Sequence, residues 1–131
     1  SLHDALPILR NIGTTGQVLV ASGTPQWKYP YEIYSGFKAL TSDSSDHWDC
    51  KNDGLNVTWE IDGDYTLTID NEQVGMCGVM YLNVTAEATV TLSGVTEYGN
   101  GTLTDLPVGR YMFCFMCIAA NTINWNIALY E

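Results

Sequence analysis

The stretch "GRYMFCFMCIAANTINWNIAL", from Gly109 to Leu129, decides what kind of fold this chain can adopt. A Pro-x-Gly turn at Pro107–Gly109 leads into it and starts a predicted strand of about nine residues. A loop is predicted near Ala120–Thr122, and apolar residues then alternate with polar ones, a period typical of a β-strand. The apolar residues of this last strand face one way; they are Ile123, Trp125, Ile127 and Leu129. The stretch therefore predicts a β-hairpin that carries much of the core.

The first strand of this hairpin is apolar on both faces. One face carries Tyr111, Phe113 and Phe115, and the other carries Met112, Cys114, Met116 and Ile118. A second predicted strand is also apolar on both faces, with Val79 and Tyr81 on one face and Met80 and Leu82 on the other. A two-layer sandwich buries only one face of each sheet, so the second face needs a cover. We expect that cover to be another copy of the chain, with Met112, Met116, Val79 and Tyr81 at the interface. The alternative is a partly closed barrel whose loops cover the outer face.

Two more hairpins are predicted between Leu55 and Gly94, where short alternating runs are separated by turn residues. In "NVTWEIDGDYTLTID", a loop at Asp62–Asp64 keeps the apolar faces together and pairs Trp59 with Leu67. We expect a Gly or Asp of that loop in the left-handed region. In the second hairpin, Met80, Leu82 and Val84 oppose Leu92, Val90 and Ala88. The fold predicted is all-β, a jelly-roll-like antiparallel β-sandwich with an extended N-terminal arm.

The chain is expected to contain three parts. Residues 1–8, "SLHDALPI", back-translate in every codon to the end of a sequencing-adapter oligonucleotide, so they are left out of fold reasoning and the reading frame is expected to be truncated at its start. Residues 9–40 are rich in Gly, Thr and aromatic residues, and predict an extended arm or short hairpin. Residues 41–131 predict the β-sandwich head, in which the polar, acidic segment Thr41–Gly54 is expected to be a surface loop.

The net charge of the chain limits the classes of partner that it can bind. Five Lys and Arg stand against fifteen Asp and Glu, which gives a net charge of −10. Nucleic acids and anionic membranes both attract basic surfaces, so the composition argues against both as partners. No apolar run approaches the length of a membrane span, so no membrane insertion is expected.

The four cysteines do not have the arrangement of a redox or zinc site. Cys114 and Cys117 have the spacing of a redox pair, but they lie in a predicted strand, where residues three apart point to opposite faces. Cys50 and Cys77 do not supply the second pair that a zinc site needs. We expect thiols that are buried and behave as small apolar groups, with a disulfide possible but not required.

The segment "GTTGQVLVASGTPQW" resembles a lead-in found in bacteriophage tail fibres, where glycines, "GQVL" and a Trp precede a C-terminal head. Seven positions carry the match: Gly13, Gly16, Gln17, Val18, Leu19, Gly23 and Trp27. Over Leu55–Glu131 the likeness is only one of architecture. The resemblance implies a homotrimer in the virion that contacts host surface polymers through its head. It also suggests that Trp27 packs near the symmetry axis or beneath the head; the alternative is a flexible linker.

A glycan site is the best-suited binding chemistry that we find in the sequence. Sugars stack on exposed aromatic rings, and their hydroxyls need carboxylate and amide partners. One loop supplies both kinds of group, in Trp48, Asp46, Asp49 and Asn52. The alternative is that Trp48 only packs against its own loop. Trp59 and Trp125 lie on patterned apolar faces and are predicted to be core.

Catalysis and metal binding find weaker support. His47 is the sole candidate base, and it is placed in the acidic loop. Asp62 and Asp64 flank a turn, and a glycosidase needs two carboxylates that face a cleft. Asp43, Asp46, Asp49 and Asp53 crowd one segment, but their spacing matches no calcium loop. We therefore predict no catalytic residue, no metal and no cofactor.

These observations favour a non-enzymatic receptor-binding head of a phage tail fibre, directed at a host cell-surface polysaccharide. The alternative is a monomeric carbohydrate-binding module or adhesin domain of a bacterial secreted protein, located outside the cell or at its surface. The oligomeric state separates the two.

Overall fold

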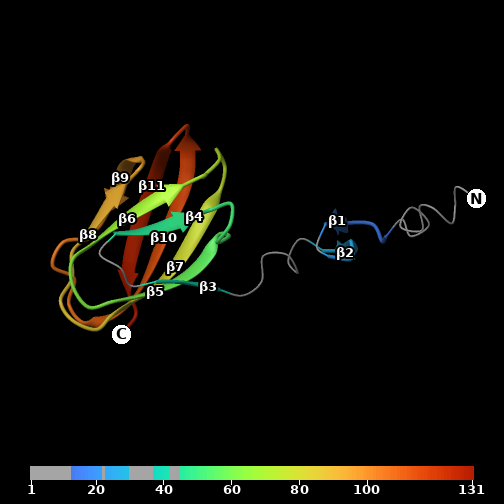
Figure 1. The fold of residues 1–131 in the computed structure, drawn as a ribbon. Coiled ribbons are helices and arrows are strands. Elements are labelled where there is room, and N and C mark those ends of the chain that lie inside the picture. Colours follow the sequence, from blue (N-terminus) through green and yellow to red (C-terminus); the bar gives the residue numbers. More distant parts are fainter. Residues whose placement is uncertain (1–12, 22, 30–36, 42–44) are drawn as a thin grey trace, which may run out of the picture. The chain divides into compact units, whose positions relative to one another are not determined.

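A computed structural model describes residues 13–21, 23–29, 37–41 and 45–131, and it divides the chain into two compact units, Ser1–Ser35 and Gly36–Glu131 (Figure 1). Residues 1–8, expected to derive from an adapter, lie outside the described residues. The first unit contains an antiparallel hairpin of β1 (Val18–Val20) and β2 (Gln26–Lys28). The second unit begins earlier than the predicted head, because β3 (Lys38–Leu40) already pairs with one of its strands.

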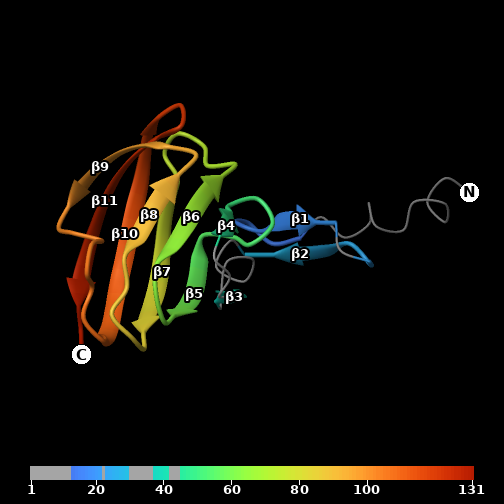
Figure 2. The ribbon, with the colours of Figure 1, turned by 60° about the vertical axis from the view of Figure 1, so that its left-hand side comes forward.

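The second unit is all-β, as predicted. Its remaining strands are β4 (Ser45–Asp49), β5 (Asn56–Ile61), β6 (Tyr65–Asp70), β7 (Cys77–Val84), β8 (Val90–Ser93), β9 (Thr96–Asn100), β10 (Gly109–Ala119) and β11 (Thr122–Leu129). They form a six-stranded sheet in the order β3-β5-β7-β10-β11-β9 and a three-stranded sheet in the order β4-β6-β8. The two sheets are stacked in layers, and their inner faces enclose the core (Figure 2).

Successive strands from β3 to β9 alternate between the two sheets. Neighbours within a sheet therefore run parallel, as in β4/β6, β6/β8, β3/β5 and β5/β7, and the strands stack as in a β-solenoid. The jelly-roll order is not confirmed. Both predicted hairpins between Leu55 and Gly94 are wrong, because β5 and β6 lie in different sheets, as do β7 and β8. The alternation of apolar residues shows which side chains face the core. This pattern is the same whether two strands are neighbours in one sheet or face each other across the core from opposite sheets.

The connection between β5 and β6 has the predicted length. It spans residues 62–64, but none of Asp62, Gly63 and Asp64 has a positive φ, so the left-handed residue that we expected is absent. A left-handed residue suits the tight reversal of a hairpin, whereas this connection crosses from one sheet to the other.

The C-terminal hairpin is confirmed. β10 and β11 pair antiparallel, with Phe113 beside Ile127 and Phe115 beside Trp125. The turn contains Asn121 in the left-handed region, with φ of 50°. β10 has eleven residues rather than about nine. It also pairs antiparallel with β7, which attaches the hairpin to the solenoid-like part.

Most of the predicted inward positions are confirmed, with the exception of Leu129 at the end of β11, which is 60% exposed. Val57, Trp59, Ile61, Leu67, Ile69, Met80, Leu82 and Val84 are all buried. Beyond β8 the core is closed by the segment that contains Leu103 and Leu106, both buried. The Val90 N–H donates to the Leu103 carbonyl at 2.9 Å, and Ala88 and Leu106 form an isolated bridge.

Two glycines make room for the largest rings of the six-stranded sheet. One inward-facing row crosses four strands in the order Gly78, Phe115, Trp125 and Gly99. A Cβ on Gly78 would lie 2.2 Å from Phe115, and one on Gly99 would lie 2.0 Å from Trp125. Glycine within a strand marks such a close approach, so each aromatic ring lies over a glycine of the next strand.

We predict that Gly78→Ala lowers the free energy of unfolding by about 1–3 kcal/mol, the usual range for overpacking a dense core. The added methyl would collide with Phe115 and with Trp48, whose nearest ring carbon would lie 2.8 Å away. Denaturant titration measures the change. Gly63→Ala is the matched control, because nothing lies within 4 Å of its added Cβ. Equal stabilities for the two variants would contradict this account of the row.

Candidate functional site

The predicted glycan platform, Trp48, is part of the core. Its residue is 0% exposed, and its ring meets Phe115 edge-on, with centroids 5.0 Å apart and planes at 76°. Its Nε1–H donates to the Gly54 carbonyl at 2.9 Å. The structure thus contradicts both the stacking role of Trp48 and the description of Thr41–Gly54 as a surface loop. Within that segment, β4 directs residues 46 and 48 inward and His47 outward, an alternation that the acidic residues obscured.

Asp49 organises the turn that follows β4. Its carboxylate accepts hydrogen bonds from the Lys51 N–H at 3.0 Å and from the side-chain amides of Asn52 at 2.6 Å and Asn71 at 2.8 Å. The amide of Asn71 is the main cause that lowers the pKa of Asp49 below its ordinary value. Asp46, by contrast, is only 8% exposed. The four predicted residues therefore do not form one surface: Asn52 is exposed, Asp49 holds a turn, and Asp46 and Trp48 are buried.

His47 pairs with a carboxylate on the neighbouring strand. Its Nδ1 lies 2.7 Å from Asp70 Oδ2, and its side chain is 60% exposed. The hydrogen bond to Asp70 is the largest cause that raises the pKa of His47 above its ordinary value of 6.5. An exposed histidine engaged with an aspartate in this way, on the outer face of the three-stranded sheet, has the geometry of a surface ion pair.

The cysteines divide between the two faces. All four are free thiols; Cys50 and Cys117 are buried, Cys114 is half-buried and Cys77 is exposed. Cys114 and Cys117 point to opposite faces of β10, as the strand spacing predicted, but the expectation that all four are buried is wrong for Cys77. Burial raises the pKa of Cys50 to about 12, so this thiol stays protonated and unreactive at neutral pH.

The outer face of the six-stranded sheet holds the predicted interface residues of the head. Val79, Tyr81 and Met112 are half-buried, and Met116 is 51% exposed. They lie on the adjacent strands β7 and β10, where Met112 pairs with Tyr81. Trp27, the fifth predicted interface residue, belongs to the first unit and packs against Gly13 there, where an added Cβ would lie 2.6 Å from its ring.

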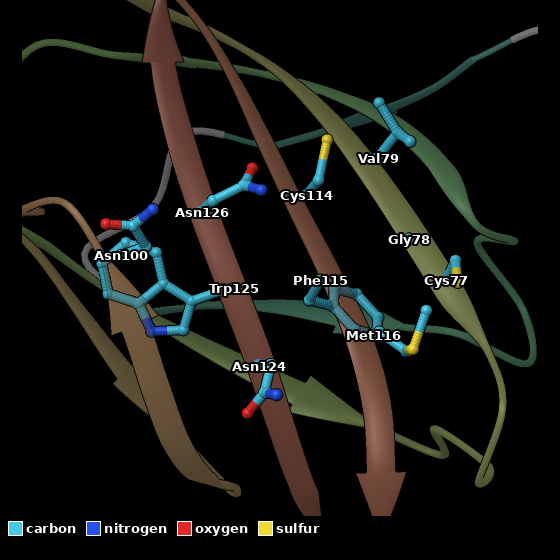
Figure 3. Close-up of a pocket in the computed structure, with 10 residues that line it drawn as sticks. All are labelled: Cys77, Gly78, Val79, Asn100, Cys114, Phe115, Met116, Asn124, Trp125 and Asn126. Atoms are coloured by element: carbon cyan, nitrogen blue, oxygen red, sulfur yellow. The ribbon is translucent and has the colours of Figure 1, made fainter.

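A hollow of about 410 Å³ lies on this same outer face. It is lined by Cys77, Gly78, Val79, Asn100, Cys114, Phe115, Met116, Asn124, Trp125 and Asn126, and we call it the asparagine hollow (Figure 3). Its residues come from four neighbouring strands, β7, β10, β11 and β9. Three exposed amides, Asn100, Asn124 and Asn126, occupy the β11 and β9 side, whereas Val79, Cys114 and Met116 form an apolar side.

Two cross-strand rows explain how the hollow arises. In the first, Cys77 pairs with Met116, which pairs with Asn124, which pairs with Tyr98; the second consists in the same way of Val79, Cys114, Asn126 and Asn100. Tyr98 is therefore beside the hollow on the same face, and it is 62% exposed. Cysteine, valine and asparagine have short side chains, so the surface of the sheet is recessed where these residues lie next to one another.

These amides were not among the predicted site residues, although the sequence carries a signal for them. In "INWNIA", both asparagines alternate with buried residues, so they had to share the outer face. Asn100 and Tyr98 carried no such signal, because they join the asparagines only through the parallel pairing of β9 with β11.

Comparisons with known proteins identify no relative: no family model, no curated protein and no solved structure matches this chain. Within the described ranges, no cluster of three or more His, Cys, Asp or Glu residues is arranged to hold a metal ion. The same residues include no helix with the length and apolar character needed to cross a membrane.

We predict that Trp48→Ala lowers the free energy of unfolding by about 3–5 kcal/mol, the usual cost of removing a buried large aromatic side chain. The reason is the loss of its packing against Phe115 between the two sheets. Chemical denaturation measures it, with His47→Ala as control, since that neighbouring side chain is exposed. A Trp48→Ala protein as stable as the control would show that the ring is not core.

We further predict that NMR titration of His47 gives a pKa above 6.5 and that Asp70→Asn moves it toward that value. Because the folded pKa is raised, the pair stabilises the fold fully below pH 6.5, and its contribution is lost as the pH rises through the folded pKa. An identical His47 pKa in both proteins would contradict the assigned pair.

Proposed function

We propose that this chain is the non-enzymatic head of a homo-oligomeric, trimeric fibre of the phage tail-fibre type, which attaches to a host surface polysaccharide. The observation that carries the proposal is the contrast between the two outer faces of the second unit. Large apolar side chains remain accessible on one of them, and polar side chains cover the other.

On the six-stranded sheet, Val79, Tyr81, Met112 and Met116 form what we call the apolar strip of β7 and β10. On the three-stranded sheet, the outward positions are polar: the hydroxyl residues Thr66, Thr68, Thr91 and Ser93, together with His47, Asp49 and Asp70. A contiguous exposed apolar patch on a soluble protein marks an interaction surface. Symmetric association with identical copies is the commonest way in which such a patch is covered.

The lead-in supports the fibre type. Residues 13–29 supply the glycines, the "GQVL" sequence and Trp27 on which the resemblance rests, and within them β1 and β2 pair as an antiparallel hairpin in the first unit. A fibre head placed in the virion and exposed to the host surface follows from that resemblance.

We propose no catalytic role because the two aspartates considered as a glycosidase pair are engaged in structural hydrogen bonds. Asp62 accepts a hydrogen bond from the Tyr65 hydroxyl, and Asp64 Oδ1 accepts one from the Thr89 N–H at 2.9 Å. Both side chains hold the connections between the sheets. His47 is engaged by Asp70 on the outer face of the three-stranded sheet.

Light scattering tests the proposal. We expect a trimer in solution and expect Met116→Lys to convert it to monomers, because a charge placed in an apolar interface must be desolvated. Since Met116 is exposed in the single copy, the variant should fold normally, which circular dichroism checks.

Thr91→Lys is the matched control, an exposed strand position on the outer face of the other sheet, and it should remain trimeric. A wild-type chain that stays monomeric at tens of micromolar would overturn the fibre proposal and favour a monomeric carbohydrate-binding module.

A further inference from the structure

We propose that the asparagine hollow is a binding site for a neutral glycan, with Asn124, Asn126 and Asn100 as its polar contacts and Tyr98 as a stacking ring. The inference deepens the proposed function, on which it rests, by naming the site and the class of sugar. It also replaces the site predicted around Trp48, which is buried.

The polar groups of the hollow suit hydroxyl ligands. Asn126 pairs with Asn100 across β11 and β9, and Asn124 lies two residues from Asn126 on the same face, so three amides line the same side of the hollow (Figure 3). Each side-chain amide offers two donors and one acceptor oxygen. Neighbouring sugar hydroxyls both donate and accept, so an amide can serve a pair of them at once.

The charge pattern selects a neutral ligand. Among the described residues that line the hollow there is no Asp, Glu, Lys, Arg or His. Burial raises the pKa of the Cys114 thiol, so that side chain is uncharged at pH 7 as well. The chain as a whole carries a net charge of −10, which repels anionic sugars at low ionic strength. Without a basic group to compensate, sialylated, sulfated or uronic acid residues are disfavoured.

The apolar groups suit the carbon faces of a sugar ring. Met116 and Val79 lie on one side of the hollow, and the exposed ring of Tyr98 flanks Asn124 on the other. Ligand sites in proteins combine such apolar walls with a few placed polar groups.

The site is compatible with the oligomer. The amides lie on β11 and β9, and β9 is the last strand of the sheet, whereas the apolar strip lies on β7 and β10. A second copy seated on Tyr81 and Met112 therefore leaves the amide side at the rim of the interface. Met116 and Val79, at the end of the strip beside the hollow, then border both the partner copy and the glycan. There the glycan reaches Asn124 and Asn126 from solvent.

The test uses the full chain on an array of neutral hexose and N-acetylhexosamine oligosaccharides beside their sialylated and sulfated counterparts. We expect neutral glycans to bind, and Asn124→Ala and Asn126→Ala each to weaken binding about tenfold, the effect of losing roughly one good hydrogen bond. Tyr98→Ala should weaken it as well. Asn83→Ala is the matched control, because this asparagine lies on the same face of β7 outside the hollow and is engaged by Glu60. It should bind like the wild type.

Light scattering on the same samples separates the two proposals. If the wild type is a trimer that binds no neutral glycan, or if Asn124→Ala binds as well as the wild type, the proposal that the hollow is the glycan site is wrong and the fibre-head proposal stands. A monomer that binds neutral glycans through Asn124 overturns the fibre head and leaves the hollow intact. Preference for the acidic glycans would overturn the assignment of ligand class.

Discussion

The edge-on contact between Trp48 and Phe115 joins the two sheets on which every later feature depends. Trp48 comes from β4 of the small sheet and Phe115 from β10 of the large one, and Gly78 leaves the space that both rings need. Because the chain alternates between the sheets, no single hairpin holds the solenoid-like part together. Its strands stay stacked because their inward side chains share one dry layer, in which a fully buried tryptophan contributes more area than any other residue type.

This layer also decides what is left on the surface. Every strand must direct one face inward, so the other face is available for solvent or partners. On β4, β6 and β8 the outer positions carry hydroxyls, His47 and two aspartates, a surface suited to water. On β7 and β10 they carry methionine, valine, tyrosine and cysteine, and on β11 and β9 they carry asparagine and tyrosine. The second unit therefore has one polar outer face and one outer face with two chemically different strips.

The two strips connect the proposals. An apolar strip beside an amide strip allows association of copies and capture of a neutral sugar on the same sheet, with neither requiring the buried residues to move. Weak binding of a single sugar at one such site is compatible with firm attachment, because linked copies raise the effective concentration of each further site. A trimer of heads offers that gain without any new contact.

The sequence by itself determined the all-β class, the inward faces of the strands and the C-terminal hairpin. Alternation at Val57, Trp59 and Ile61, or at Ile123 and Trp125, is a local property of the chain and survives any choice of neighbours. Only the tertiary structure decided which strands share a sheet, since β5 and β6 face each other across the core with the same alternation that a hairpin would show. For the same reason the candidate glycan site lies elsewhere than the sequence predicted. Trp48 is buried because β4 joins the small sheet, and Tyr98 and Asn100 reach Asn124 and Asn126 only through a parallel pairing of β9 with β11, which nothing local in their own segment specifies.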